Sequence, residues 1–321
     1  MLFLLVSLVP EAQARTVKLN SLFPPLPAQA AWLYYQRPVV LSGQRLSGKE
    51  NYWKFTAQIR MFDEHNNSLG GCTGVLISPN AALTAAHCLD ESETAVKKVK
   101  LVFYDHSTTP AKEIMRSTES FRIHPTYLPA SGAEQDDYID AQGKILFDYL
   151  NYSMSQNSYK IDFTKGYGVP VFPELHSQGT DLGVIYFTNE MPAHFEPVAF
   201  YEGQLTKDFK YGANLVGIGF GLNALNIKSL DNELRFTDLA ILGVLPNASQ
   251  FDLLTFATKS EGLIFGDSGG PTVLVKEGKS YLIGINSSSF LNGHATHSLP
   301  GQFSQWIADT VQELINENRN I

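Results

Sequence analysis

The chain has 321 residues, of which 44% are apolar and 17% are charged, a balance typical of folded globular proteins rather than disordered ones. Its formal net charge is −8 and it contains no long basic run, which argues against a nucleic-acid-binding surface. The length suffices for one large domain or two medium ones. The 25 glycines, 16 prolines and many aromatic residues favour β structure with many turns.

The first residues have the pattern of an export signal. Leu2 to Val9 is almost wholly apolar, and Ala12-Gln13-Ala14 supplies a small-x-small cleavage pattern, although no basic residue precedes the apolar run. The stretch is too short to span a bilayer, and no other segment approaches transmembrane length. We therefore expect a signal peptide at 1–14, a secreted or periplasmic protein and no stable membrane anchor. A buried N-terminal strand is the alternative interpretation.

Residues 15–48 are rich in proline and glutamine and show no clear period. We interpret them as a leader, a propeptide or a loosely packed arm. From Tyr52 onward short strand-like segments follow one another, and residues 55–62 alternate as a half-buried strand does. Further strands are predicted at 74–77, 99–104, 182–188, 214–218, 239–245, 272–275 and 281–285.

The strand pattern degrades between about 128 and 173, where we expect an insertion. Its acidic cluster, Glu134, Asp136 and Asp137, indicates solvated charge rather than a calcium site, and we expect neither a metal nor a cofactor. The last apolar residues are spaced three and four apart and predict one face of a terminal helix: Phe303, Trp306, Ile307, Val311, Leu314 and Ile315. Many short strands and one closing helix indicate a β-barrel or β-sandwich protein.

The segment Gly266-Asp267-Ser268-Gly269-Gly270-Pro271 has the properties of a nucleophile loop. A serine hydroxyl is a weak nucleophile and must lie where a base can reach it and an acyl group can approach. Flanking glycines remove side chains that would block this approach, and they allow successive N–H groups to converge on a developing oxyanion. A glycine-rich turn between two strands is the simpler alternative, but this six-residue string is far less common than such turns.

The segment Leu83-Thr84-Ala85-Ala86-His87-Cys88 offers a candidate general base, because small residues before His87 allow the imidazole to be packed rigidly. Alone, such a histidine is more often a core or turn residue, and the serine segment downstream is what favours the catalytic role. The two cysteines of the chain are Cys72 and Cys88. In an exported protein an even pair predicts one disulfide, and two cysteines without a nearby ligand set make a poor zinc site.

A third group should orient the histidine and stabilise its charged form. Asp181 stands at the start of the apolar run Leu182-Gly183-Val184-Ile185, where a carboxylate can be buried behind an imidazole. The other aspartates of this region lie in polar, loop-like sequence and are expected on a solvated face: Asp136, Asp137, Asp140 and Asp162.

Two of these segments, Thr84–Cys88 and Gly266–Pro271, resemble the signature segments of the chymotrypsin-like (trypsin-like) serine proteases. Asp181–Ile185 looks like the aspartate strand of that family, and Ile123–Tyr127 is similar to the surface segment that precedes it. The order His, Asp, Ser along the chain is that of the chymotrypsin group. The serine segment is the most specific part of the resemblance.

The resemblance extends from about Trp53 to Leu314, where Trp306-Ile307 also matches the terminal helix. It implies an all-β fold of two six-stranded antiparallel β-barrels with a C-terminal α-helix and an active site in the cleft between the barrels. The peptidase domain would span 49–312. The first barrel would occupy about 49–200, and the second barrel with the helix about 201–317.

The resemblance also implies the role of each residue. His87 and Asp181 from the first barrel and Ser268 from the second would form the catalytic triad. The backbone N–H groups of Gly266 and Ser268 would form the oxyanion hole. Ser268 would attack a peptide carbonyl with His87 as base, and water would then release the acyl group from the enzyme.

The sequence departs from the family pattern in two places. His87 and Asp181 are 94 residues apart, against roughly 45 in the chymotrypsin template, so the first barrel carries an extra block of about forty to fifty residues. The usual activation sequence of a basic residue, two aliphatics and two glycines is absent, and Arg37-Pro38-Val39-Val40 is its nearest match. Asp267 would normally receive the freed N-terminus, and an internal cation is the alternative partner here.

The substrate pocket is also altered. In the family register Gly262 lies at the base of the pocket, where trypsin-type enzymes carry an aspartate, so a strict preference for Arg or Lys is not expected. Ser287, Ser288 and Ser289 would pair with the substrate backbone. Asn286 and these serines would make a polar pocket with Phe265 at its rim.

Together these features predict a secreted serine endopeptidase that acts on protein or peptide substrates. The alternatives are a catalytically silent binding protein that keeps the protease scaffold, and a hydrolase that acts mainly on esters, because esters share the same acyl-transfer chemistry.

Overall fold

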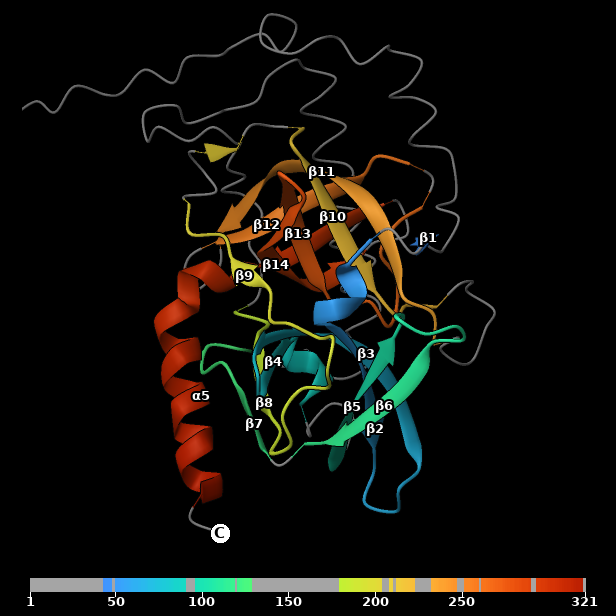
Figure 1. Cartoon of the computed structure of the whole chain (residues 1–321). Coiled ribbons are helices and arrows are strands. Elements are labelled where there is room, and N and C mark those ends of the chain that lie inside the picture. Colours follow the sequence, from blue (N-terminus) through green and yellow to red (C-terminus); the bar gives the residue numbers. More distant parts are fainter. Residues whose placement is uncertain are drawn as a thin grey trace, which may run out of the picture.

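The computed structural model describes residues 43–47, 50–90, 96–118, 120–128, 179–203, 208–209, 212–222, 232–246, 251–259, 261–289 and 293–319. The predicted signal peptide, the leader up to residue 42 and residues 129–173 of the predicted insertion lie outside the described residues. Figure 1 shows two bodies of strands, the blue and green ones of the first half below the orange ones of the second. Helix α5 (Ser304–Arg319) runs alongside the lower body.

Seven antiparallel strands form the sheet of the first half, in the order β6-β5-β2-β3-β4-β8-β7. Their bounds are β2 Thr56–Phe62, β3 Ser68–Ser78, β4 Ala81–Thr84, β5 Lys98–Asp105, β6 Lys112–Ser117, β7 Ser120–Ile123 and β8 Gly183–Tyr186. A short 3-10 helix, Tyr52–Phe55, leads into β2.

The end strands of this sheet, β6 and β7, are successive segments of the chain. β6 ends at Ser117 and pairs with β5, whereas β7 begins at Ser120 and pairs with β8. One short stretch of chain therefore has partners at both ends of the sheet order. The sheet therefore curves round on itself, and we call it the first barrel. If β6 and β7 are counted as one bent strand, this barrel has six strands.

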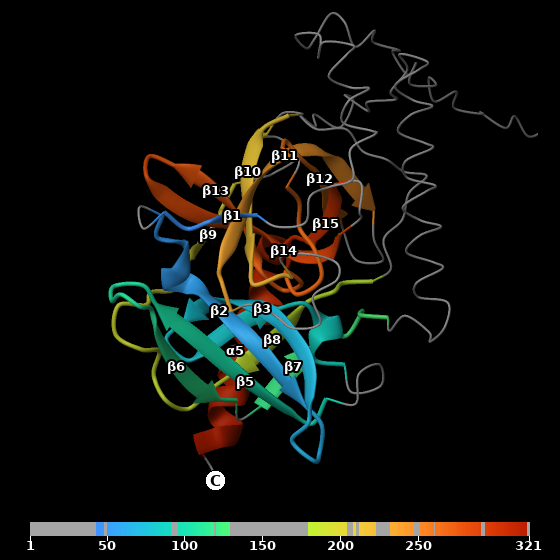
Figure 2. The same ribbon diagram turned by 90° about the vertical axis from the view of Figure 1, so that its right-hand side faces the viewer.

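The second half contains a closed ring of six strands, β11-β10-β13-β14-β15-β12, because β12 also pairs with β11. Figure 2 shows these strands curving around a common interior. Their bounds are β10 Asn214–Gly219, β11 Arg235–Pro246, β12 Phe251–Ala257, β13 Pro271–Lys276, β14 Lys279–Ser289 and β15 His294–Ser298. Two further short strands, β1 (Gln44–Arg45) and β9 (Ala199–Phe200), pair with β11 and β14.

Buried apolar side chains form two clusters. The larger fills the first barrel and continues into the second half, where its members include Ile218, Val273 and Ile285. The smaller fills the second barrel around Leu239, Ile241 and Leu253. Burial of one such side chain stabilises the fold by about 1.5–3 kcal/mol. Because the larger cluster is shared, the same apolar burial that folds the first barrel also fixes it against the second.

Helix α5 follows the strands of the second barrel but packs against β7 and β8 of the first. It buries Ile307, Thr310 and Leu314, which recur at helical spacing. Glu317 forms an ion pair with Arg122 of β7 at 2.7 Å. The helix therefore ties the end of the chain to the first barrel.

The predicted fold class is confirmed: the protein is mostly β, with a closed six-stranded barrel, a second sheet and one C-terminal helix. Strands β1, β4, β6, β7, β9, β12 and β15 were not predicted. The sequence of β15, His-Ala-Thr-His-Ser, has no apolar alternation. The proposed domain boundaries remain predictions, although Gln44 and Arg45 of the predicted leader already pair with β11. Within the described residues, no helix is both long and apolar enough to cross a membrane.

Candidate active site

His87 and Asp181 are in direct contact in the first barrel. His87 lies on a 3-10 turn, Ala86–Cys88, that directly follows β4, and Asp181 lies just before β8. Strands β4 and β8 pair in antiparallel register, with Thr84 opposite Gly183, so the sheet brings together two residues that are far apart in the sequence. The Nδ1 atom of His87 is 2.7 Å from Oδ2 of Asp181, and the backbone N–H of His87 donates to Oδ1 at 3.0 Å.

These contacts favour the ionised form of Asp181. Burial by itself would raise its pKa, but the charge of His87 and hydrogen bonds from His87 and Ser287 outweigh burial and lower the pKa below its ordinary value. An ionised carboxylate only accepts hydrogen bonds, so Nδ1 of His87 carries the proton in this pair. The imidazole is thereby oriented with Nε2 as its basic nitrogen. The side chain of His87 remains 28% exposed, which leaves it accessible from outside.

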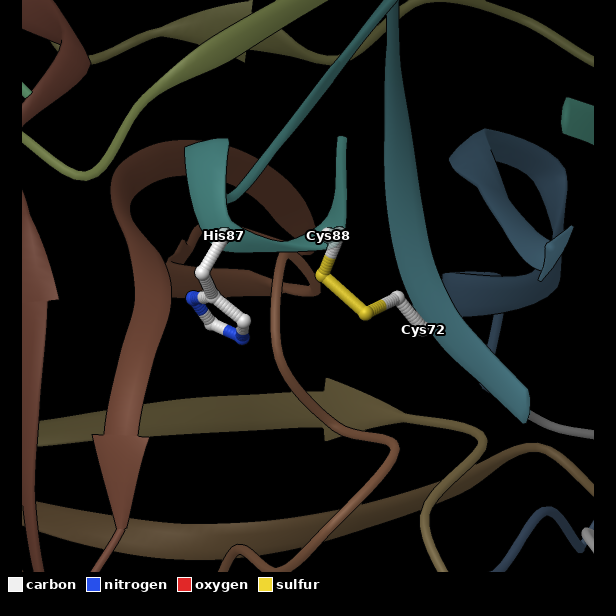
Figure 3. Close-up of side chains that lie close together, drawn as sticks. All are labelled: Cys72, His87 and Cys88. Atoms are coloured by element: carbon white, nitrogen blue, oxygen red, sulfur yellow. A yellow bond between two sulfur atoms is a disulfide. The ribbon is translucent and has the colours of Figure 1, made fainter. Parts of the chain in front are cut away.

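The segment that carries His87 is cross-linked to β3. Cys72 and Cys88 form a disulfide, as predicted. Figure 3 shows the His87 ring on the same turn as Cys88 and beside the disulfide. The two sulfurs and a ring nitrogen of His87 lie within 4.8 Å of one another, but both sulfurs are bonded to each other and are not free thiolates. The disulfide therefore serves to hold the histidine turn.

Ser268 lies on the loop between Ile264 and β13, and its main chain packs against this cross-linked segment. Its carbonyl oxygen accepts a hydrogen bond from the N–H of Thr73 at 2.8 Å and lies 3.8 Å from Sγ of Cys88. The latter is a packing contact, because a disulfide sulfur has no proton to donate. Among the described residues, no hydrogen bond joins the Ser268 hydroxyl to His87. The main chain of Ser268 and the ring of His87 therefore both lie beside the Cys72–Cys88 disulfide.

The loop conformation requires glycine at position 269. Gly269 has a φ of +79°, and a Cβ there would collide with the Thr84 hydroxyl and the Thr73 carbonyl. The backbone of the loop can therefore approach the first barrel more closely than a larger residue would permit.

Thr73 connects the two halves at this loop, and the sequence patterns gave it no role. Its hydroxyl donates to the carbonyl of Gly266 at 2.8 Å and accepts from the N–H of Phe220 at 2.9 Å. Its carbonyl accepts from the Thr84 hydroxyl at 2.9 Å. Because Thr73 is fully buried, these bonds form away from water and set the position of the loop relative to the first barrel. Its place directly after Cys72 was the only signal in the sequence.

The backbone N–H groups of Gly266 and Ser268 donate to no acceptor in the described part of the chain. Unpaired N–H groups are rare in folded proteins unless water or a ligand satisfies them. Both residues are partly exposed.

Asp267, next to the serine, is turned into the protein. Its two carboxylate oxygens accept the N–H groups of Gly221 and Ile264, each at 2.8 Å. Burial raises its pKa to about 6, against the opposing effects of these two bonds and of the charge of Arg235. Arg235 is the cation whose charge favours the ionised form of Asp267. It also forms an ion pair with Glu233 at 2.7 Å. Gly219 and Gly221 leave the space that the Asp267 side chain fills.

The predicted pocket residues lie in different environments. Gly262 is buried, and with Asp267 and Arg235 it lines a small cavity. Phe265 is 65% exposed. It borders a surface cavity of about 610 Å³ together with Arg60, Leu69 and Gly266.

The four polar residues of β14 that were assigned to the pocket differ in exposure and in hydrogen-bond partners. Ser287, Ser288 and Ser289 are partly exposed. The hydroxyl of Ser287 donates to Oδ2 of Asp181 at 2.7 Å, so this side chain supports the aspartate. Asn286 is only 3% exposed, and its side chain is hydrogen-bonded inside the barrel. The expectation that the Asn286 side chain helps to line an open pocket does not fit this position.

Comparison with known proteins points to one class. The family model described as Trypsin matches residues 45–138. Among solved structures, GrC has a TM-score of 0.53 and 15% identity, and the match covers 85% of this chain and 100% of that chain. Neuropsin, described as a serine protease expressed in the limbic system of mouse brain, has a TM-score of 0.52 and 17% identity, covering 84% of this chain and 99% of that chain. At these identities the two structures demonstrate a common fold.

The fold is thus that of a chymotrypsin-like β-barrel protein. The chain is similar in sequence to the Trypsin family model over residues 45–138, and it is similar in fold to these two solved structures over most of its length. The predicted resemblance to the chymotrypsin-like serine proteases is confirmed by the family-model match, which includes the histidine segment, and by the fold.

Proposed function

We propose that this protein is a secreted serine endopeptidase with Ser268 as nucleophile, His87 as general base and Asp181 as the group that orients the histidine. The observation that carries the proposal is the double contact of Asp181 with His87, through the ring at 2.7 Å and through the main chain at 3.0 Å. A buried carboxylate held in this way selects one tautomer and stabilises the imidazolium that forms during proton transfer.

The proposed reaction has two steps. In the first, Nε2 of His87 takes the proton of Ser268 while Oγ attacks the peptide carbonyl carbon, and the protonated histidine then donates that proton to the leaving amine. In the second, His87 removes a proton from water, the resulting hydroxide attacks the acyl-enzyme, and the proton returns to Oγ as the peptide acid leaves. The unpaired N–H groups of Gly266 and Ser268 would bind the oxyanion formed in each step.

Protein or peptide substrates are favoured by the last residues of β14, which pair with β15 on one side but, within the described residues, have no strand partner beyond Ile285 on the β13 side. Ser287, Ser288 and Ser289 are partly exposed there and can pair with an extended substrate backbone. Because no carboxylate stands at position 262, a buried basic side chain would have no partner there, and we propose a specificity other than that of trypsin. The Cys72–Cys88 disulfide supports an oxidising compartment outside the cytosol, in keeping with the export signal expected at 1–14.

One observation favours a silent binding scaffold instead. Within the described residues, the Ser268 hydroxyl forms no hydrogen bond with His87, whereas an assembled triad joins them. Such bonds are often loose in the absence of substrate and tighten when it binds, so the active enzyme remains our proposal.

The test is covalent labelling of the secreted protein by a fluorophosphonate, followed by intact-mass spectrometry. One adduct is expected on the wild type and none on Ser268→Ala. Ser280→Ala is the matched control, because it removes a partly exposed serine at the far end of β14 and should be labelled as the wild type is. The mass before labelling also locates the mature N-terminus.

The outcomes separate the candidate functions. No adduct on a folded, processed chain would overturn the proposal in favour of the binding scaffold. Labelling together with turnover of p-nitrophenyl esters, but of no peptide library, would favour a hydrolase that acts mainly on esters.

A further inference from the structure

The interior of the second barrel contains a chain of polar side chains that the proposed reaction does not use. Thr255 on β12, Thr272 on β13, Asn286 on β14 and His297 on β15 are all buried, and three of them are 0% exposed. Polar groups in such a position are costly unless they are hydrogen-bonded to one another. The hydrogen bonds among these four side chains therefore show which parts of the main chain they position.

The orientation of the Asn286 amide is fixed by its neighbours. Its Nδ2 lies 3.1 Å from the carbonyl oxygen of Ile218 and 3.1 Å from that of Asp267. Backbone carbonyls only accept hydrogen bonds, so the atom that faces them is the NH2 group and Oδ1 faces the other way. Oδ1 receives the Thr272 hydroxyl at 2.7 Å.

This orientation in turn fixes the tautomer of His297. Its Nδ1 is 3.1 Å from Oδ1 of Asn286 and 3.1 Å from the Thr272 hydroxyl oxygen. The amide oxygen can only accept, and the Thr272 hydroxyl already donates its proton to Oδ1, so Nδ1 must carry a proton. Its Nε2 is 2.7 Å from the Thr255 hydroxyl, which donates to it when the ring is neutral. Burial lowers the pKa of His297 to about 3, so the ring is neutral at ordinary pH. The hydrogen bonds therefore run in one direction, from Thr255 through His297 and Asn286 to the carbonyl of Asp267.

The end of this chain is the loop that carries Ser268. Besides its side-chain bond to Asp267, the main chain of Asn286 accepts the N–H of Gly269 at 2.7 Å and donates to the carbonyl of Gly270 at 2.8 Å. Asn286 thus holds the residues on both sides of Ser268. The next residue, Ser287, donates to Asp181, so the same two residues of β14 contact both the serine loop and the carboxylate that orients His87.

We propose that Asn286 and His297 are positioning residues that hold the Ser268 loop in register with Asp181. An apolar residue at position 286 would keep the main-chain bonds of β14 but would remove the amide donor that joins the Asp267 and Ile218 carbonyls, and the Asp267 carbonyl would keep the N–H of Gly270. His297 acts one bond further away, by fixing Oδ1 of Asn286 and so the direction of its NH2 group. This inference rests on the proposed function of Ser268, because its effect is read through catalysis.

The kinetic test uses the full secreted protein with Asn286→Leu and His297→Leu. We expect kcat, and the rate of fluorophosphonate labelling, to fall about tenfold to a hundredfold for Asn286→Leu and less for His297→Leu, because small displacements of a reacting group are costly. KM should change by about twofold at most, because the exposed serines of β14 are retained. Asn286→Asp, which keeps Oδ1 but loses the donor, should resemble Asn286→Leu.

The control for a purely structural effect is Thr56→Val. The Thr56 hydroxyl is buried in the first barrel and donates to the carbonyl of Tyr52 at 2.7 Å, so its loss lowers stability by a comparable mechanism away from the loop. We expect this variant to lower Tm but not the kcat of the folded fraction. If Asn286→Leu also keeps kcat after correction for folded protein, the positioning role is wrong.

The hydrogen-bond chain can be tested without catalysis. In a ¹⁵N–¹H spectrum of the wild type and of His297→Leu, the resonances lost in the variant identify His297. The Nδ1–H tautomer, unchanged down to about pH 4, is expected. An Nε2–H tautomer would overturn the proposed chain of bonds. Absence of fluorophosphonate labelling on the wild type, with the Nδ1–H tautomer present, would refute the enzyme proposal and leave the hydrogen-bond chain intact.

Discussion

The two halves of the molecule hold the proposed active-site residues by different means. In the first barrel, His87 stands on a turn cross-linked by the Cys72–Cys88 disulfide, and the strand before it packs into the larger apolar cluster. In the second, the loop around Ser268 is held by hydrogen bonds from Thr73 and Asn286 and by the buried carboxylate of Asp267. Covalent and apolar restraints tolerate changes of pH, whereas buried polar groups depend on their protonation state. The histidine and serine sides should therefore respond differently to the same perturbations.

The largest effect should come from the carboxylate behind the histidine. Asp181→Asn keeps the shape of the side chain but removes the charge that selects the Nδ1–H tautomer of His87. On the Ser-His-Asp template we expect kcat to fall by about 10³–10⁴-fold with little change in KM, as measured by steady-state peptide hydrolysis.

The control for Asp181→Asn is Asp105→Asn. Asp105 is also a buried aspartate of the first barrel, but it binds the N–H of Ser107 and lies outside the site. Its kcat should be near that of the wild type. An equal loss of kcat in both variants would mean that the effect of Asp181 is one of stability.

The second prediction concerns the covalent restraint of the first barrel. The double change Cys72→Ala/Cys88→Ala opens a loop with a sequence separation of 16 residues, and in the chain-entropy model this costs about 3 kcal/mol of the free energy of unfolding. Urea unfolding followed by tryptophan fluorescence measures this loss. The loss should be the same at pH 5 and pH 7, since a disulfide does not titrate. A stability equal to that of the wild type would show that the apolar core alone fixes the histidine turn.

The third prediction concerns pH and the second barrel. Burial raises the pKa of Asp267 to about 6, so between its unfolded pKa near 4 and this value the folded state binds more protons than the unfolded state. The free energy of unfolding therefore contains a contribution that is complete below about pH 4 and is lost as the pH rises through 6, by up to roughly 3 kcal/mol. The difference in urea unfolding between the wild type and Asp267→Asn from pH 4 to pH 8 isolates this contribution. A difference that does not vary with pH would contradict it.

The smallest loss of kcat is expected from the hydrogen bond between the two halves, from Ser287 to Asp181. Ser287→Ala removes the hydroxyl that β14 donates to Oδ2 of Asp181 but leaves the bond from His87. The loss of one such hydrogen bond is worth about 1–2 kcal/mol, or roughly five- to thirtyfold in kcat if it acts only in the transition state. Ser280→Ala on the same strand should have no effect on kcat. An unchanged kcat in Ser287→Ala would show that His87 alone suffices to hold the carboxylate.

The spacing of apolar residues along the sequence predicted much of the fold. The alternating apolar residues of β2 and the helical spacing in α5 predict both elements, because in each of them the apolar residues at that spacing pack into the larger apolar cluster. Strand β15 escaped detection because its inward-facing residues include polar ones that satisfy each other across strands, and a periodicity of hydrophobic residues cannot register them.

The sequence by itself singled out His87, Asp181, Ser268 and the cysteine pair, because their chemistry is carried by short strings of neighbouring residues. Tertiary structure alone decided the roles of Thr73, Ser287, Asn286 and His297. The Thr73 hydroxyl meets Gly266 across 193 residues, and Ser287 meets Asp181 across 106. Such contacts depend on how strands pair and barrels pack, and no local pattern encodes which buried donor will face which acceptor.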